Sequence, residues 1–193
     1  MINKLGFGFL RLPKREDDYD WDAVSAMVDA FMNGGGFYFD TCYTYLDGFS
    51  EIGINKCVVQ RKPRNSFQLC NKLPGYLFKS YDDCQRYFEI ELQRCGVDYF
   101  DVLMLHWLND KNYAIAEKCD EFRFLREKKA EGIAKRIGFS YHGNAALLDK
   151  ILAAHPEVDV VLLQINYLDW ESAGIQSRKC YETCVHHGKK VIV

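Results

Sequence analysis

The chain has 193 residues, of which 48% are hydrophobic and 15% aromatic. This composition excludes a disordered chain and predicts one globular domain over residues 1–193. Its 25 basic and 27 acidic residues give a formal charge of −2 and are interspersed, so no basic face suggests nucleic acid. We recognise neither a secretory leader nor an apolar run of about 18 residues, and we expect a cytoplasmic protein that does not engage a membrane.

Eight cysteines are spread along the chain without a C-x-x-C pair. A chain this apolar does not need disulfides, so we expect reduced cysteines that pack as small hydrophobic residues. Cys180 and Cys184 stand four residues apart near His186 and His187, and they could present metal ligands on one helix face. An ordinary helix end explains the same pattern, and we expect no metal site.

Helical and apolar segments alternate along the chain. Apolar spacing predicts helices over residues 21–33, about 50–60, 80–95, about 113–132, 145–155 and about 172–188. Between them, short apolar runs predict strands, and "KKVIV" opens a further one. This alternation indicates βαβ units and a parallel sheet that is buried on both faces.

The predicted strands end in polar residues, which are Asp40, Lys72, His106, Ser140, and Gln164 together with Asn166. Taken singly, each has an ordinary explanation, such as a solvated lysine or an aspartate that caps a turn. The ends of parallel strands meet at one face of the sheet, however, so these groups should share one space. This is how the active site of a (β/α)8 TIM barrel is built.

The segments "FDTCYTY", "CNK" and "LMLHW" resemble the strand-end motifs of the aldo-keto reductase family, as do "LGFGFLRLP", "IGFS" and "LQINY". The resemblance spans almost the whole chain. It implies an NAD(P)H-dependent oxidoreductase that reduces an aldehyde or ketone to an alcohol, with Asp40, Tyr45, Lys72 and His106 as the catalytic residues. The spacing of the family motif selects Tyr45 as the proton donor and leaves Tyr43 a structural role.

The chemistry explains why these residue types belong together. Carbonyl reduction needs a hydride, which NADP or NAD supplies, and a proton, which the protein supplies. We expect Lys72 to lower the pKa of the Tyr45 phenol and Asp40 to hold Lys72 charged and in place. His106 would orient the carbonyl oxygen as a neutral hydrogen-bond donor.

The resemblance also implies a set of cofactor contacts. Ser140 and Gln164 would bind the nicotinamide carboxamide, Gly8 would let the cofactor approach the backbone, and Asn166 is a further candidate. The chain departs from the family pattern after Ser140, where "YH" replaces a common Asn, and after the tyrosine, where "YLDG" delays the glycine.

In the family, the seventh and eighth units supply the ring that stacks on the nicotinamide and the contacts to the phosphates, and here the sequence stops at Val193 inside the seventh strand. The resemblance therefore implies an incomplete barrel of about six and a half of eight units. We expect such a chain to be inactive by itself, to bind NADPH weakly and to self-associate at its open edge. The sequence distinguishes neither NADP from NAD nor one carbonyl substrate from another.

Three other functions remain to be weighed. A non-catalytic cofactor-sensing or scaffold subunit of the same fold has no reason to keep the whole catalytic set. A metal-dependent barrel hydrolase needs more strand-end ligands than Asp40 and His106. A Rossmann site at Gly6-x-Gly8 lacks both a third glycine and a helix directly after it.

Overall fold

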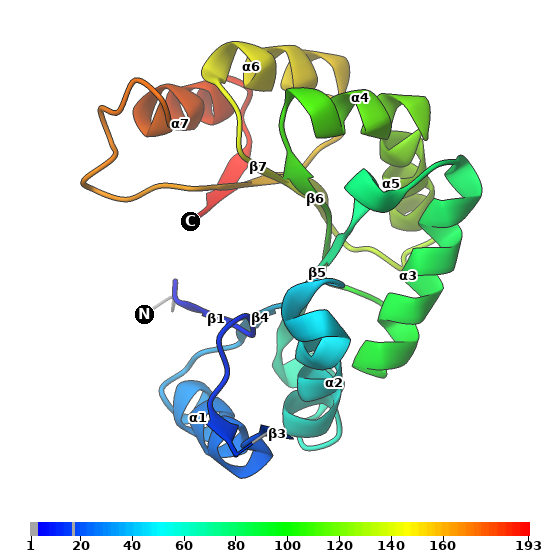
Figure 1. Cartoon of the computed structure of the whole chain (residues 1–193), viewed down its shortest axis with the longest axis vertical. Coiled ribbons are helices and arrows are strands. Elements are labelled where there is room, and N and C mark those ends of the chain that lie inside the picture. The colour runs from blue at the N-terminus through cyan, green and yellow to red at the C-terminus, as the bar shows by residue number, and fades with distance from the viewer. Residues whose placement is uncertain (1–3, 17) are drawn as a thin grey trace.

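A computed structural model describes residues 4–16 and 18–193. Seven parallel strands form one curled sheet in the order β1-β4-β5-β6-β7-β8-β9, so β1 and β9 are its edges (Figure 1). The strands are β1 Gly6–Gly8, β4 Tyr38–Asp40, β5 Gln68–Leu73, β6 Val102–Leu108, β7 Ile137–Tyr141, β8 Val160–Leu163 and β9 Lys190–Ile192. The prediction of a parallel α/β sheet is confirmed.

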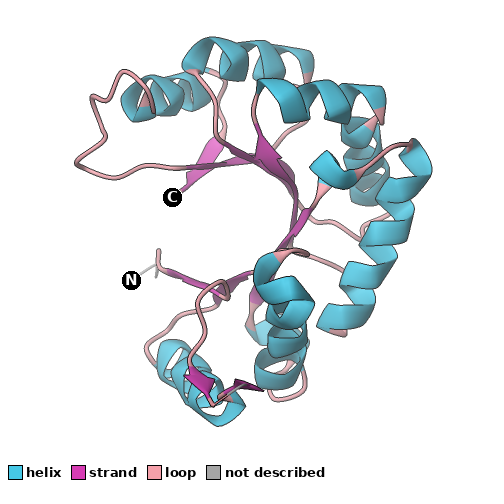
Figure 2. Ribbon diagram, viewed as in Figure 1, coloured by secondary structure: helices cyan, strands magenta, loops and turns pink. Residues whose placement is uncertain are grey.

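Helices cover the outer face of the curled sheet (Figure 2). They are α1 Trp21–Asn33, α2 Phe49–Ile54, α3 Tyr81–Cys95, α4 Asp110–Lys118, α5 Glu121–Ala130, α6 Ala145–Ala154 and α7 Ser177–His186. Short helical turns are η1 Tyr45–Gly48, η2 Asn55–Val59, η3 Arg64–Ser66 and η4 Gly75–Leu77. A small antiparallel hairpin, β2 Lys14–Arg15 with β3 Asp18–Tyr19, follows β1, so no helix starts directly after the Gly6-x-Gly8 segment.

Two helix starts follow from capping side chains. Ser80 and Asp83 form a reciprocal capping box at the start of α3, and Gly96 ends that helix with a φ of 69°. The Asn144 side chain accepts a hydrogen bond from the N–H of Leu147 at the start of α6. These boundaries agree with the sequence prediction.

Other predicted boundaries are wrong. The helix expected over residues 113–132 is two helices, because the chain turns at Cys119 and at Asp120, whose φ is 58°. Apolar positions continue on both sides of this turn, and periodicity therefore does not reveal it. The helix expected over 50–60 changes to a π-type turn at Asn55, and α7 begins only at Ser177.

Strand β8 also ends earlier than predicted, at Leu163, so Gln164 and Asn166 lie beyond the sheet. The Asn166 side-chain oxygen accepts hydrogen bonds from the N–H groups of Leu168 and Asp169, each at 2.9 Å. This local turn satisfies backbone donors that a longer strand would have paired.

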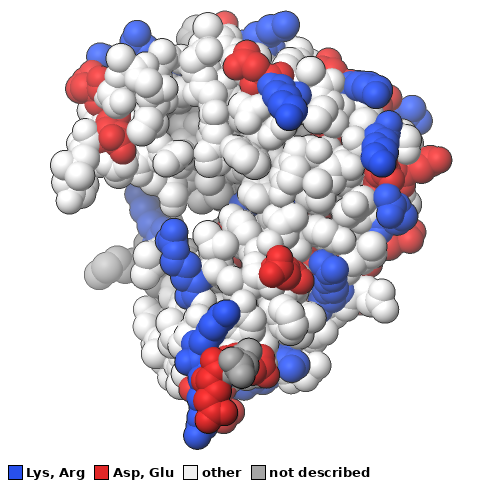
Figure 3. Space-filling model, in the orientation of Figure 1, with Lys and Arg blue, Asp and Glu red and all other residues white. Residues whose placement is uncertain are grey.

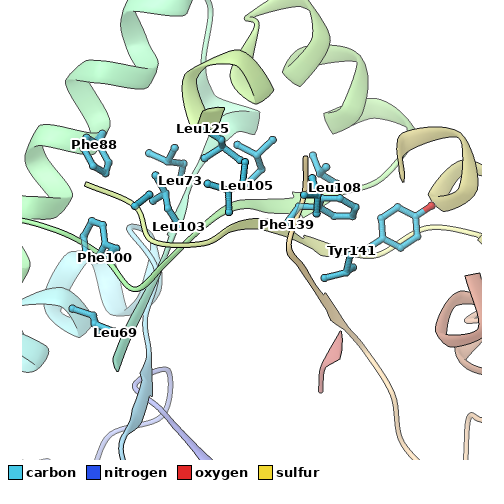
Figure 4. Packing of buried hydrophobic residues seen from close by; sticks show 14 of the residues in the cluster. Leu69, Leu73, Phe88, Phe100, Leu103, Leu105, Leu108, Leu125, Phe139 and Tyr141 are labelled. Atoms are coloured by element: carbon cyan, nitrogen blue, oxygen red, sulfur yellow. The ribbon is translucent and has the colours of Figure 1, made fainter. Parts of the chain in front are cut away.

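Alternation of side chains along each strand separates two apolar layers. Leu103 and Leu105 of β6 pack outward against the helices with Phe139 of β7 (Figure 4). Val102 and Met104 point to the inner side of the curled sheet, where they join a smaller cluster. The same alternation decides which polar residues reach the inner side.

The surface agrees with the mixed charge pattern of the sequence. Basic and acidic side chains are interspersed on the face that Figure 3 shows. Of the helices in the described part of the chain, none has both the length and the apolar character that crossing a bilayer requires.

Candidate active site

The inner side of the sheet collects the predicted catalytic residues at the carboxyl ends of the strands. Gly8 is in register with Asp40, Asp40 with Cys70, and Lys72 with Met104. His106 has the same parity as Met104 on β6 and therefore also faces inward. The register of the parallel strands thus brings a carboxylate, an ammonium and an imidazole to one place.

Lys72 is held between two acceptors. Its Nζ donates to a carboxylate oxygen of Asp40 and, at 2.9 Å, to the carbonyl oxygen of Thr41. Burial is the largest single influence and by itself would lower the pKa of Lys72, but Asp40 and the neighbouring Cys70 and Tyr45 together raise that pKa above its ordinary value. The lysine is 1% exposed and stays charged, which is the arrangement expected for Asp40 as its partner.

Tyr45 begins η1, and its ring lies beside the lysine. The Nζ of Lys72 is 5.0 Å from the centroid of the Tyr45 ring. Burial raises the pKa of the Tyr45 phenol, and Lys72 counteracts that rise without reversing it. Lys72 thus acts on the pKa of Tyr45 in the expected direction, but burial is the larger effect and the net change is a rise.

Tyr43 occupies a different environment. The guanidinium carbon of Arg94 lies 4.4 Å from the centroid of the Tyr43 ring, and the ring of Tyr87 packs edge-on at 4.9 Å. Arg94 also pairs with the buried Glu51 at 3.1 Å. Tyr43 thus packs on α3, whereas Tyr45 meets the charged pair.

His106 lies beside Tyr45 with its ring edge-on at a centroid distance of 5.6 Å. Burial, together with the charge of Lys72, lowers the pKa of His106 to about 3, so the imidazole is neutral near neutral pH. Its Nδ1 is 3.0 Å from the sulfur of Cys42. The neutral state of His106 is the one expected from the sequence.

A bulge in β6 brings an aromatic residue to the rim of the site. The register with β7 shifts between Leu105 and Leu108, and Trp107 has a φ of 61°. The Ser140 hydroxyl accepts a hydrogen bond from the N–H of Trp107, and the Asn112 side-chain amide donates to the carbonyl oxygen of Trp107, each at 2.7 Å. The indole is half exposed, 5.7 Å from the ring of Tyr76.

Sequence reasoning did not identify Cys42, Tyr76 or Trp107 as neighbours of the catalytic set. Trp107 directly follows His106, and a regular strand would have turned it to the opposite face. Tyr76 sits in η4, a short turn without a periodic pattern. Cys42 lies inside the quoted "FDTCYTY" segment, which is the one signal that could have drawn attention to it.

The predicted cofactor residues are distributed around the same end of the sheet. A side chain built on Gly8 would meet no atom within 4 Å, so the space beside this glycine is open in the described structure. Ser140 is buried and holds Trp107, while Gln164 is exposed. Asn166 is exposed and has its side-chain oxygen engaged by its own turn, which separates it from the other three.

A pocket of about 280 Å³ adjoins Gln164. It lies between the segment after β7, the end of β8 and the start of α7, and its polar lining includes His142, Asn144 and Ser177. Tyr141, which replaces the common Asn of the family pattern, donates its hydroxyl proton to the carbonyl oxygen of Asn144 at 2.6 Å. The lining of this pocket thus includes Gln164, one of the predicted nicotinamide contacts, but none of the four predicted catalytic residues.

The cysteine and histidine pair near α7 has other contacts. The Cys180 thiol donates to the carbonyl oxygen of Gly143 at 3.7 Å, and His187 pairs with Asp149 at 2.7 Å. Within residues 4–16 and 18–193, no group of three or more His, Cys, Asp or Glu side chains is placed to hold a metal ion. All eight cysteines are buried, and none of them forms a disulfide bond.

Comparisons with known proteins agree with this geometry. An aldo-keto reductase of Mycolicibacterium smegmatis is 27% identical over 140 residues, which cover 72% of this chain and 46% of that protein. The chain thus spans about half the length of the curated relatives that it matches.

Solved structures show the fold. An aldo/keto reductase from Klebsiella pneumoniae in complex with NADP and acetate superposes with a TM-score of 0.74 at 19% identity, covering 97% of this chain and 62% of that one. A Brucella melitensis aldo/keto reductase gives a TM-score of 0.76 at 19% identity, with 97% and 66% covered. The model of the aldo/keto reductase family matches residues 4–193. On this match, and with the strand-end residues assembled as described, the chain belongs to the aldo/keto reductase family.

Proposed function

We propose that this chain carries the reducing site of an NADP(H)-dependent oxidoreductase that converts an aldehyde or ketone to an alcohol. The observation that carries the proposal is the buried Lys72 ammonium, which is held by Asp40 and lies 5.0 Å from the Tyr45 ring centroid, with the neutral imidazole of His106 edge-on to the same ring at 5.6 Å. An ammonium buried next to a phenol is suited to stabilise the phenolate that remains when a proton has been donated.

When bound, the cofactor supplies the hydride to the carbonyl carbon. Tyr45 is the proton donor for the carbonyl oxygen, and its raised pKa keeps the phenol protonated before the reaction. The charge of Lys72 favours the phenolate, and Asp40 keeps Lys72 in place. His106, neutral and inward-facing, donates a hydrogen bond that orients the same oxygen.

The residues that are present fit the nicotinamide end of such a cofactor. The open space beside Gly8 admits a ligand close to the backbone of β1, next to Asp40. The exposed Gln164 side chain and the pocket beside it offer a partner for the carboxamide. Ser140 retains its hydroxyl proton for the same group, because it accepts rather than donates in its bond to Trp107. The NADP bound to the Klebsiella pneumoniae relative supports this choice of cofactor.

The substrate rim favours flat carbonyl compounds. The rings of Tyr76, Trp107 and His142 follow one another at centroid distances of 5.7 and 6.5 Å, and the Tyr76 ring lies 5.9 Å from that of His106. Aromatic faces of this kind pack on planar apolar groups. An unsaturated or aromatic aldehyde therefore suits the rim best.

Several expectations stay predictions. They are one partial barrel domain over residues 1–193 with about six and a half of eight units, a cytoplasmic location, and the absence of metal, membrane and nucleic-acid partners. Low activity and weak NADPH binding of the chain by itself, and its self-association, are also still to be tested. The alternative of a non-catalytic cofactor-sensing subunit predicts NADPH binding without turnover.

The test is a pair of tyrosine variants in the full-length protein in which residues 1–193 occur. We expect Tyr45→Phe to lower the rate of NADPH oxidation with an aromatic aldehyde by about 10²- to 10⁴-fold while NADPH binding, followed by fluorescence, stays nearly unchanged. Tyr43→Phe is the matched control and should stay active. Loss of activity in Tyr43→Phe alone, or NADPH binding by the wild type without any turnover, would contradict the proposal.

A further inference from the structure

Cys42 makes an unusual contact for a buried cysteine. It lies two residues after Asp40, the last residue of β4, it is fully buried, and its sulfur lies 3.0 Å from Nδ1 of His106. Buried cysteines usually pack as small hydrophobic residues. Here the sulfur meets a ring nitrogen, so packing alone does not describe the contact.

The contact belongs to a series of polar side chains that are linked by hydrogen bonds. Thr44 Oγ1 is 3.5 Å from the Cys42 sulfur, and the Tyr76 hydroxyl is 3.1 Å from the same Thr44 oxygen. This series therefore runs from the half-buried Tyr76 through Thr44 and Cys42 to His106. These four side chains come from η4, from the segment between β4 and η1, and from β6.

Two opposite directions of donation would satisfy this series, and the distances favour one of them, because the shorter contact, 3.0 Å against 3.5 Å, joins the sulfur to the stronger acceptor, Nδ1 of His106. A neutral imidazole has one N–H donor and one acceptor nitrogen, and a thiol sulfur is a weak acceptor. Burial raises the pKa of Cys42 to about 12, so the thiol keeps the proton that it can donate. Donation from Tyr76 to Thr44, from Thr44 to the sulfur, and from the thiol to Nδ1 satisfies every member.

We propose that Cys42 is a positioning residue whose thiol donates to Nδ1 of His106 and thereby fixes the imidazole as the tautomer with its proton on Nε2. Among the described residues none hydrogen-bonds to Nε2, so this N–H is available to a carbonyl oxygen. The catalytic consequence rests on the proposed function, because it requires that His106 orients the substrate. The tautomer itself does not depend on any activity.

The first experiment measures the tautomer directly in the 193-residue chain. Two-bond ¹H–¹⁵N correlation spectra of the histidine rings, assigned with a His106→Gln variant, distinguish protonated from unprotonated nitrogens. We expect the wild type to show an unprotonated Nδ1 and a protonated Nε2. A proton on Nδ1, or an even mixture of both tautomers, would overturn the inference whatever the protein catalyses.

Variants at Cys42 then test whether the thiol is responsible. In Cys42→Ala, the ratio of the Nε2-protonated to the Nδ1-protonated form of His106 should fall by about fivefold, toward the ratio in free imidazole. This is the change that corresponds to the loss of one net hydrogen bond. Cys42→Ser keeps a donor and should retain the single tautomer. Cys184→Ala removes another buried thiol, from α7, and should leave the His106 signals unchanged.

An unchanged tautomer in Cys42→Ala, or loss of the single tautomer in Cys42→Ser, would show that the thiol does not set the imidazole. If Cys42→Ala fails to fold, the wild-type and Cys42→Ser spectra decide. In the full-length reductase, Cys42→Ala should lower kcat severalfold with KM for NADPH unchanged, and Cys42→Ser should restore kcat. A wild-type tautomer as expected, together with no turnover, would leave this inference standing and would contradict the proposed function instead.

Discussion

Replacing Asp40 by Asn tests what the ion pair with Lys72 contributes to the folded chain. The Lys72 side chain is 1% exposed and that of Asp40 is 19% exposed. At contact distance and an effective dielectric constant of about 20, two unit charges attract by roughly 5 kcal/mol, part of which is offset by desolvation. Asn keeps an acceptor but no charge, so we expect the free energy of unfolding at neutral pH to fall by about 3 kcal/mol.

The pH dependence of this variant has a definite sign. In the wild type, burial opposes the charge of Lys72, but Asp40 and neighbouring groups together raise its pKa above the ordinary 10.5. The stability that the pair contributes is therefore present below that pH and is lost only above it. Without Asp40, burial lowers the pKa of Lys72. The unfolded variant then binds more protons than the folded one, and the stability of Asp40→Asn should rise as the pH increases toward 10.5.

Urea unfolding followed by tryptophan fluorescence at several pH values measures both effects in the 193-residue chain. The double variant Asp40→Asn/Lys72→Met should be more stable than Asp40→Asn, because no charge remains buried. Asp29→Asn is the control, since Asp29 pairs with Arg61 and Lys62 at the surface, and it should have a much smaller effect. Wild-type stability of Asp40→Asn with no gain at higher pH would refute the reasoning.

Three further predictions follow from the same site and core. Lys72→Met should reduce carbonyl reduction about as much as Tyr45→Phe does, and a near-normal rate would remove the lysine from the mechanism. His106, with its pKa lowered to about 3, should show no titration of its ring signals between pH 5 and 8, and its contribution to stability should fall as the pH drops below about 6.5. Glu121 is buried without a partner and its pKa is raised to about 8, so stability should fall as the pH rises from about 4.5 to 8, and Glu121→Gln should be more stable than the wild type by about 2 kcal/mol at neutral pH in urea titrations.

The parallel sheet and the meeting of Asp40, Lys72 and His106 could be predicted because both depend on strand alternation. Each residue ends or nearly ends an apolar run, and parallel strands place such ends together. The break at Asp120 and the early end of β8 could not be predicted, because hydrophobic periodicity continues across the first and an apolar run continues past the second. Both are decided by local turns.

The surroundings of the site were harder to predict for a different reason. Whether the pKa of Tyr45 rises or falls depends on how much burial opposes the charge of Lys72, and burial is a property of the packed chain. The contact between Cys42 and His106 joins residues 64 positions apart, on segments that pattern analysis treats separately. A sequence shows which residue types are present, but it does not show how strongly burial and neighbouring charges act on each of them.

The hydrogen bond between Ser140 and the backbone of Trp107 has a consequence for how two ligands bind. In the proposed function, Ser140 also contacts the cofactor, so one hydroxyl serves both the nicotinamide side and the indole at the substrate rim. The backbone of Trp107 has a φ of 61°, a strained conformation that this hydrogen bond helps to maintain. A ligand that binds the Ser140 hydroxyl therefore also affects the conformation of Trp107. Linkage makes this effect reciprocal: whatever factor the cofactor adds to the affinity for substrate, the substrate adds to the affinity for cofactor.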